Sequence, residues 1–362
     1  MPSLRNSSAM IIGDLPDPRR SRNGGDAGAT LRSSAVLVHE QRLLLRDAMA
    51  KVLSPGQAYA LVDFPNFSNV GDSAIWLGAR ALLEDLAGRP PAYVATIKGF
   101  NEAALTAAVG SGPILINGGG NFGDLWPAHQ DLREELLRRF PGRPIIQLPQ
   151  SIKFHDLGRA QRFAELGRQH GNFTLMVRDE ASREFAREAL GIEAPLVPDC
   201  AVYLGPQQRR ATPDVATVLL LRTDEERAGV ERGAFGSLEN SRLVDWIEEP
   251  ANLFKNAKRR ARVEALMRGQ FSRSARRLTL FDRLARQRLE RGLAMLSEGE
   301  AVITDRLHGH ILSLLLDMPH VALDNSYGKV SGYIGAWNRN YEHLRLATSV
   351  ETALAGRGEL AR

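Results

Sequence analysis

The stretch VITDRLHGHILS, residues 302–313, places four charged or titratable side chains between two apolar runs. This pattern predicts a buried strand, a tight turn and then a buried helix. In open α/β sheets, turns from strand to helix line the crevice in which ligands bind. One interpretation is that the four side chains bind a ligand there, namely Asp305, Arg306, His308 and His310. The other is that Asp305 caps the helix and Arg306 pairs with Asp305.

Outward from this stretch, short apolar runs alternate with segments of helical spacing along most of the chain. Predicted strands cover residues 58–64, 92–97, 113–117, 144–148, 173–177, 216–222, 301–305 and 320–324. Predicted helices lie at about 75–86, 101–109, 128–139, 156–170 and 180–190. This alternation indicates parallel sheets with helices on both faces. The expected fold is α/β, with two Rossmann-like domains that face a cleft.

Changes in composition suggest where the chain divides. The first residues are rich in Ser, Arg, Asn, Asp and Gly, which is typical of a disordered arm. A stretch without periodicity, residues 203–214, ends the first set of strands. The predicted parts are a disordered N-terminal arm (1–33), an N-terminal Rossmann-like domain (34–205), a C-terminal Rossmann-like domain (212–345) and a C-terminal tail (346–362).

The overall composition is that of a globular protein, because 43% of the 362 residues are hydrophobic and 25% are charged. No run of about 18 apolar residues is present, so we expect no membrane span. The single cysteine, Cys200, excludes an intramolecular disulfide and a multi-cysteine metal site. With no apolar signal core at the N-terminus, these features favour a cytoplasmic location, and we predict no metal site.

The net charge of +5 is unevenly distributed. Residues 255–291 contain thirteen Lys or Arg and three acidic residues, so this segment carries +10 and the rest about −5. Nucleic acids and anionic membranes both attract such a segment, but it lacks interleaved Tyr or Trp and a nucleic-acid module. We therefore expect either a solvated helical face or reversible attachment to the inner face of the cell membrane. Its proposed apolar anchors are Phe254, Leu266, Phe271, Leu278, Leu280, Phe281, Leu284 and Leu289.

A polar turn follows the first predicted strand. In PNFSNVGDSAIW, residues 65–76, Asn69, Gly71 and Asp72 precede an apolar helix. Asp72 or Ser73 could cap this helix, which would be a structural role. The backbone N–H groups at the start of the helix could equally bind an anion.

A glycine-rich turn follows the third predicted strand. In INGGGNFGDLW, residues 116–126, successive glycines reduce the stability of the chain, yet they permit backbone to approach a ligand closely. The stretch matches neither a P-loop nor a dinucleotide-binding fingerprint. A backbone nest for phosphate or for sugar hydroxyls fits better, and a tight structural turn is the alternative. The candidate binding residues are Gly119, Gly120, Asn121 and Asp124.

An arginine directly follows the fifth predicted strand, in MVRDEAS, residues 176–182. The planar guanidinium of Arg178 suits bidentate binding of phosphate or carboxylate, and a structural pair with Asp179 is the alternative. We expect Arg306 and His308 to face Arg178 across the cleft. Two arginines suit a substrate that carries both a phosphate and a carboxylate.

These motifs resemble those of the polysaccharide pyruvyl transferase family. The similar stretches, in the same order over about residues 57–338, are NVGD (69–72), GGGNFGD (118–124), RDEAS (178–182), PD (198–199) and TDRLHGHILSLLLDMP (304–319). The resemblance implies a two-domain fold like that of GT-B glycosyltransferases. It also implies transfer of pyruvate from phosphoenolpyruvate to a sugar, usually as a ketal. No resemblance extends over residues 225–292, so their role and the acceptor are left open.

The resemblance assigns roles to three residues, since the family binds phosphoenolpyruvate with arginines and a histidine that correspond to Arg178, Arg306 and His308. Histidine donates protons readily near neutral pH, so we expect His308 to be the general acid. Asp72 is expected to deprotonate the acceptor hydroxyl. The expected substrate-binding residues are Arg178, Arg306, Asn69, Gly71, Gly119, Gly120, Asn121, Asp124 and His310. Phosphoenolpyruvate and a lipid-linked saccharide are the expected partners, with no cofactor and no nucleic acid.

Two other functions fit the same pattern. A nucleotide-sugar glycosyltransferase could use the same two-domain scaffold, because a fold does not determine a function. The released product, phosphate or a nucleoside diphosphate, separates these two enzymes. A basic binding protein without enzymatic activity is the third possibility, but it leaves the glycine run and the turn at Arg306 without a purpose.

Overall fold

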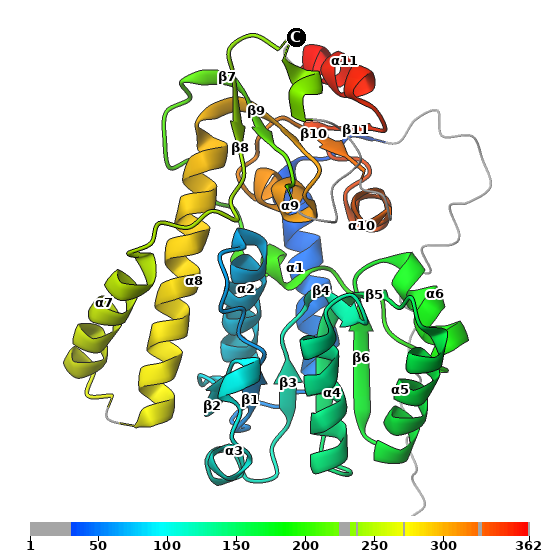
Figure 1. Cartoon of the computed structure of the whole chain (residues 1–362), viewed down its shortest axis with the longest axis vertical. Coiled ribbons are helices and arrows are strands. Elements are labelled where there is room, and N and C mark those ends of the chain that lie inside the picture. Colours follow the sequence, from blue (N-terminus) through cyan, green and yellow to red (C-terminus); the bar gives the residue numbers. More distant parts are fainter. Residues whose placement is uncertain (1–29, 224–231, 237, 271, 325–327, 361–362) are drawn as a thin grey trace, which may run out of the picture.

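The computed structural model describes residues 30–223, 232–236, 238–270, 272–324 and 328–360. These residues form two parallel sheets flanked by helices, so the predicted α/β class is confirmed (Figure 1). Most of the predicted N-terminal arm (1–29) and the proposed anchor Phe271 lie outside the described residues. Among the helices of the described residues, none is long and apolar enough to cross a membrane.

The first sheet contains the predicted strands and one that was not predicted. Its strands are β1 (Ala60–Val62), β2 (Tyr93–Ala95), β3 (Ile114–Ile116), β4 (Gly119–Gly123), β5 (Ile145–Lys153) and β6 (Phe173–Val177). All pairs are parallel, and β3 and β4 pair with successive parts of β5 while β6 also pairs with β5. The connecting helices are α2 (Val70–Ala87), α3 (Glu102–Val109), α4 (Pro127–Arg139), α5 (Leu157–His170) and α6 (Glu180–Ala189).

The second sheet is also parallel. Its strands are β7 (Val215–Leu220), β8 (Ser241–Val244), β9 (Gly299–Thr304), β10 (His320–Leu323) and β11 (Leu344–Ala347), in the order β11-β10-β9-β7-β8. Its helices are α7 (Leu253–Met267), α8 (Arg273–Ser297), α9 (Leu307–Leu315), α10 (Lys329–Trp337) and α11 (Val350–Leu360).

The two sheets are wound in the same way. In each, the first strand lies between the second and the third, and the later strands extend from the third. The strand order therefore reverses between β1 and β3 in one sheet and between β7 and β9 in the other. Ligands of open α/β folds bind beyond the carboxyl ends of the strands at such reversal points. The fold thus predicts one binding edge in each half of the molecule.

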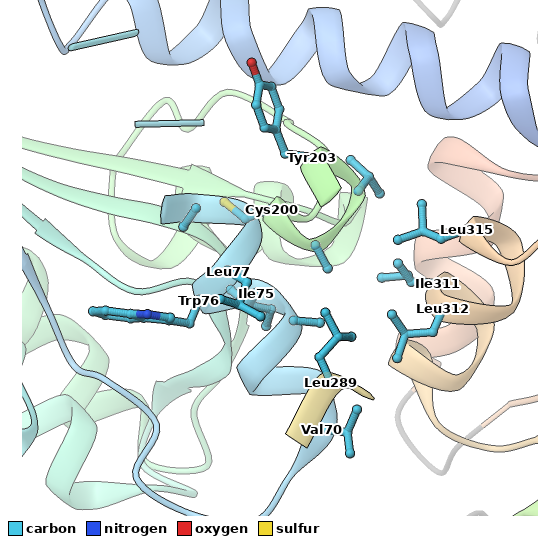
Figure 2. Close-up of a cluster of buried hydrophobic side chains, with 14 of the residues drawn as sticks. Val70, Ile75, Trp76, Leu77, Cys200, Tyr203, Leu289, Ile311, Leu312 and Leu315 are labelled. Carbon is cyan, nitrogen blue, oxygen red and sulfur yellow. The ribbon is translucent and has the colours of Figure 1, made fainter. Parts of the chain in front are cut away.

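One hydrophobic core joins the halves. Val70 and Leu77 of α2 belong to the same buried cluster as Ile311 and Leu315 of α9 (Figure 2). Cys200, in the short helix η3 (Cys200–Leu204), is part of it too. The sequence indicated two separate domains, but it contains no local signal for a core that is shared between them.

Both ends of the described chain also differ from the predictions. A long helix, α1 (Ser34–Ala50), contacts α2 of the first half and α9 of the second. Before it, Arg32 forms a backbone bridge with Tyr341, so residues 30–33 are not part of a disordered arm. The predicted tail of 346–362 is wrong through Leu360, because β11 extends the second sheet and α11 packs against it.

The basic segment is only partly a solvated surface. Phe281, Leu284 and Leu289 of α8 are buried in the core, so they are not available as membrane anchors. Arg288 and Arg291 of α8 donate hydrogen bonds to backbone carbonyls of other elements. The expectation that the whole segment faces a membrane is therefore wrong for the buried face of α8. Arg273, Arg276 and Arg286 of α8 are exposed, and α7 also presents a basic, exposed face.

Candidate active site

The first turns of α2 and α9 meet where the two halves join. A methyl group added to Gly71 would lie 2.5 Å from the ring of His308, so the imidazole packs directly on the backbone of α2. Asn69 caps α2 by accepting a hydrogen bond from Gly71 N–H, which corrects the choice of Asp72 or Ser73 as the cap. The structure thus brings together Asn69, Gly71 and His308 from opposite halves of the chain.

The turn between β9 and α9 fixes the position of His308. Thr304, at the end of β9, donates to the carbonyl of Leu220 and accepts from Arg306 N–H. A side chain at Gly309 would lie 2.3 Å from the Thr304 hydroxyl, so the turn requires a glycine there. The polar residues quoted from this stretch are therefore held in a tight strand-to-helix turn, as predicted.

Arg178 lies at the carboxyl end of β6 and is almost fully buried. Its Nε donates to the Ser151 hydroxyl at 2.9 Å, and its Nη1 donates to the carboxylate of Asp199. Asp179 instead caps α6 through Ser182 N–H and accepts from Ser151. The carboxylate that pairs with Arg178 is therefore Asp199, and the alternative pair with Asp179 is wrong.

Asp199 contacts Arg178 and His308, two of the three residues that the family resemblance predicts to bind phosphoenolpyruvate. Its Oδ2 pairs with Arg178 and lies 3.5 Å from His308 Nε2, and its Oδ1 accepts from Ala201 N–H. Burial raises the pKa of this carboxyl, but Arg178 and His308 outweigh burial and hold the pKa below its ordinary value. The Asp199 carboxylate therefore faces both the guanidinium of Arg178 and the imidazole of His308.

Arg306 is held by a different carboxylate. Its Nη2 donates to both oxygens of Asp245, at 2.7 and 2.9 Å, and its guanidinium lies over the ring of Trp246 at 5.9 Å. Asp245 directly follows β8 and Arg306 lies just beyond β9, so this pair joins the carboxyl ends of two strands that are separated by β7. Asp305, at the same turn, accepts a hydrogen bond from Arg222 N–H of the second half.

The glycine run forms a strand, β4, and not the predicted turn. A side chain at Gly118 would meet the carbonyl of Pro149 at 2.7 Å, and one at Gly123 would meet that of Lys153 at 1.7 Å. These glycines therefore serve close packing against β5. Gly119 lies beside the Asp72 carboxylate, and Gly120 is partly exposed.

Two of the predicted binding residues have structural partners. Both oxygens of Asp124 accept hydrogen bonds from the backbone at 155–156, which lower the pKa of the carboxyl although burial opposes them. The Asn121 amide accepts from Arg133 and from Gln150. The prediction that they bind substrate gains no support from these contacts, but Asn121 also contacts a histidine, as follows.

An aspartate–histidine pair lies at the reversal point of the first sheet. Asp63 follows β1 and has a φ of 67°, which is strained for a residue other than glycine. Its oxygens lie 3.0 and 2.9 Å from His129 Nδ1, and Asn121 Nδ2 lies 3.0 Å from the same atom. Because a carboxylate can only accept a hydrogen bond, Nδ1 is the donor to Asp63, and Asp63 fixes the orientation of the His129 ring.

Two exposed aromatic residues lie next to this pair in the chain or in space. Phe67 packs edge-on against the His129 ring at 6.4 Å between ring centres, and its side chain is exposed. Trp126 is also exposed, and its backbone carbonyl accepts a hydrogen bond from the backbone N–H of His129. Rings with an apolar face and open surface provide stacking platforms for planar or sugar-like ligands.

His310 does not line this site. It is fully buried, with Nδ1 2.8 Å from His320 Nε2 and Nε2 2.9 Å from Asn338 Nδ2. Both ring nitrogens are engaged inside the second half. The prediction that His310 binds substrate gains no support from these contacts.

The sequence profile of the polysaccharide pyruvyl transferase family matches residues 69–327, which is most of the chain. The chain belongs to this family. The predicted resemblance is thereby confirmed. Every residue of the site from Asn69 to His308 falls inside the matched region, whereas Asp63 lies just before it.

Relatives of this pyruvyl transferase family member cover most of its length. The chain is 33% identical over 296 residues to "Pyruvyl transferase 1" of Schizosaccharomyces pombe, covering 77% of this chain and 69% of the relative. It is 30% identical over 292 residues to "Putative pyruvyl transferase EpsO" of Bacillus subtilis, covering 78% and 86%. A crystal structure of a Klebsiella pneumoniae protein described as uncharacterized has a similar fold, with a TM-score of 0.53 and 17% identity over 86% of this chain and 99% of the other.

Sequence reasoning missed three residues of the site of this pyruvyl transferase family member. Asp199 was quoted only as part of the motif PD, and Asp63 and His129 were not singled out. Asp63 is the one charged residue of the predicted strand 58–64, near its end, which was an available signal. His129 lies in the first turn of α4, and only the tertiary structure brings it to Asp63. Among the described residues, no group of three or more His, Cys, Asp or Glu is arranged to hold a metal ion.

Proposed function

We propose that this member of the family transfers pyruvate from phosphoenolpyruvate to a saccharide and forms a ketal. The observation that carries the proposal is the contact of Asp199 with both Arg178 and His308. It combines, in one place, a cation for the donor and an acid–base residue for the reaction. Family membership supports the transfer of a pyruvyl group, and the donor and the ketal are our inference from the residues.

The donor is an anion with a phosphate and a carboxylate. Arg178 and Arg306 supply planar guanidinium groups from the two halves, which suit these groups better than ammonium groups do. The N-termini of α2 and α9 add partial positive charge and backbone N–H groups. Asp199 and Asp245 hold the arginines in place before the donor arrives.

The reaction begins with a proton transfer. His308 donates a proton to the methylene carbon of phosphoenolpyruvate, which becomes a methyl group, and the neighbouring carbon becomes electrophilic. A saccharide hydroxyl attacks this carbon and loses its proton. Phosphate then leaves, and a second hydroxyl attacks and loses its proton to close the ketal. The carboxylate of Asp199 stabilises the protonated form of His308 that the first step requires.

The acceptor hydroxyl needs a base, and two candidates line the carboxyl edge of the first sheet. Asp72 lies beside Gly119, near the turn that packs on His308. His129 is oriented by Asp63 and lies edge-on to the exposed ring of Phe67. We propose His129 as the base, because histidine is the side chain best suited to proton transfer near neutral pH.

The remaining features of the proposal are the setting of the enzyme and its acceptor. We propose a GT-B-like arrangement, since two parallel sheets of the same winding present their carboxyl edges to one site. We also propose a cytoplasmic enzyme, a lipid-linked saccharide as acceptor, and no cofactor or metal. Activity that survives a chelator would support the last point.

The direct test incubates purified protein with phosphoenolpyruvate and an extract of lipid-linked oligosaccharides. We expect a product whose mass increases by one pyruvyl ketal, with release of phosphate. Release of a nucleoside diphosphate from a nucleotide sugar, without use of phosphoenolpyruvate, would instead identify a glycosyltransferase. His308→Gln should bind phosphoenolpyruvate in calorimetry and lose about 10²- to 10⁴-fold in turnover, as expected for a general acid. Normal turnover of this variant would exclude that role.

The two candidate bases can be separated by substitution. We expect His129→Gln to reduce turnover by about 10²-fold or more and to leave donor binding unchanged, because a base for the acceptor hydroxyl does not hold the donor. Asp63→Asn should act in the same direction, since it removes the acceptor that fixes the imidazole tautomer. If Asp72→Asn abolishes turnover while His129→Gln does not, Asp72 is the base.

A further inference from the structure

Helix α7 packs on the rest of the protein through one narrow face. Leu253, Ala257, Ala261 and Ala265 recur every fourth residue and are buried. They face α8, which is the element that α7 contacts most, and α7 lies on the outer side of α8 (Figure 1). Small alanines permit a close approach of the two helices, so the rest of the α7 surface points away from the protein.

The outward face carries large apolar side chains. Val263, Leu266 and Met267 are 55%, 70% and 82% exposed, and Leu266 and Met267 are the most exposed large hydrophobic residues in the described chain. Their spacing of three and four places them on one face of the helix. Exposed apolar residues that gather in this way are typical of a contact surface.

The charges around these residues are almost all positive. The exposed basic residues of the helix and its C-cap are Lys255, Lys258, Arg259, Arg260, Arg262 and Arg268. The one acidic residue, Glu264, is paired with Arg268 and with Arg283 of α8. Arginines of both helices also line a hollow of about 720 Å³ beside Val263 and Met267.

We propose that the outer face of α7 docks on an anionic lipid bilayer. A bilayer interface accepts apolar side chains at the acyl boundary and phosphate groups opposite the arginines, and α7 offers both in one helix. Nucleic acid would match the charge, but it would leave Leu266 and Met267 against water. The proposal concerns α7 alone, because the apolar side chains of α8 are buried, and it does not depend on the pyruvyl-transfer reaction.

The first experiment is co-sedimentation of the full-length protein with vesicles. One set contains phosphatidylcholine alone and the other also contains phosphatidylglycerol. We expect pelleting only with the anionic vesicles, and less of it at high salt, because salt screens surface charge. Arg259→Glu with Arg262→Glu should weaken attachment by about tenfold or more. Leu266→Ser with Met267→Ser should weaken it even at low salt.

Matched substitutions on another surface provide the control. Leu157 and Arg168 are an exposed leucine and an exposed arginine on α5. Leu157→Ser with Arg168→Glu should pellet like the unaltered protein. Equal pelleting with neutral and anionic vesicles would overturn the proposal, as would α7 variants that pellet normally. A loss of self-association in the α7 variants would also overturn it, since a second copy would then cover the face.

A fluorescent probe tests insertion directly. Cys200 is the single cysteine and is fully buried, and burial raises the pKa of its thiol well above the ordinary value, so it reacts poorly. An environment-sensitive dye can therefore be attached selectively to Met267→Cys. We expect its emission to increase with anionic vesicles, and the same dye on Leu157→Cys to show no change. An unchanged signal at position 267 in pelleted protein would mean that charge alone holds the protein, which contradicts the proposed insertion.

Discussion

The position of His308 depends on a residue without a side chain, Gly71. The imidazole occupies the space that a Cβ would need. Gly71 lies in the first turn of α2 with an ordinary helical backbone, so a larger residue there would be acceptable to the helix itself. The constraint comes from the packing of α9 on α2, which no property of the sequence near residue 71 reveals.

We predict that Gly71→Ala folds and loses turnover. Alanine favours a helix over glycine by about 1 kcal/mol, which offsets part of the clash with the ring. The displaced His308 should lower turnover on the order of 10²-fold, because small shifts of reacting groups have large effects on rate. The assay is steady-state turnover together with thermal unfolding. The control is Gly335→Ala, at a position of α10 with open space around it, and this variant should keep both its turnover and its thermal stability. Full activity of Gly71→Ala would mean that the reaction does not require the His308 ring in its present position.

Residues that directly follow strands were the best predicted part of the site. Arg178, Arg306 and His308 were found because each interrupts or follows an apolar run. Asp199 and His129 were not found, because their roles arise from partners distant in sequence: Asp199 lies against His308, and His129 against Asp63. A functional side chain at the end of a strand can be predicted from the neighbouring sequence, but a contact between residues of two distant elements cannot.

At the scale of elements, a buried chain of hydrogen bonds ties α9 to β10, α10 and α1. His320 Nδ1 donates to the carbonyl of Met318, which leaves Nε2 to accept from His310 Nδ1. Asn338 donates to His310 Nε2, and Gln41 of α1 donates to Asn338. Each nitrogen has a fixed role, so both imidazoles are neutral.

This chain predicts that the protein loses stability in mild acid. Burial lowers the pKa of His320 to about 4 and that of His310 well below its ordinary value. Below about pH 6.5 the unfolded chain binds protons that the folded protein does not, so the free energy of unfolding falls by up to about 1.4 kcal/mol per pH unit for each histidine. For His320 the loss ends near pH 4. Denaturant unfolding at pH values from 7.5 to about 4.5 measures this fall in the free energy of unfolding.

The matched comparison uses one buried and one exposed histidine. His320→Gln should reduce the pH dependence of stability, although it also lowers stability at neutral pH. His39→Gln, on the exposed face of α1, should leave the dependence unchanged. Equal slopes for the unaltered protein and His320→Gln would contradict the assignment of a neutral, buried imidazole.

The elements themselves were largely predictable, with β4 as the instructive exception. Apolar runs and helical spacing predicted β1, β2, β3 and β6 and the helices between them, because these segments bury one face or both. The glycines of β4 have no side chains to bury, so the sequence suggested a loop. They form a strand because β5 supplies the hydrogen-bond partners, and at Gly123 the backbone of β5 leaves no room for a side chain.

At the scale of the whole molecule, the shared core makes the halves depend on each other. Separating them would expose α2, α9 and η3 side chains of one buried cluster. We therefore predict a single cooperative transition in calorimetry, with equal calorimetric and van't Hoff enthalpies. Residues 34–205 expressed alone should not fold stably. Two resolved transitions, or a folded fragment, would show that the halves are independent domains.

Two of the four tryptophans lie against the two donor arginines. Trp337 donates its indole N–H to the backbone carbonyl of Arg178, and Trp246 lies under the guanidinium of Arg306. Indole emission responds to nearby charge and hydrogen bonding, so the protein carries an optical reporter on each side of its candidate donor site. Phosphoenolpyruvate binding should change the intrinsic emission spectrum, and Trp337→Phe and Trp246→Phe would separate the signal beside Arg178 from the signal beside Arg306.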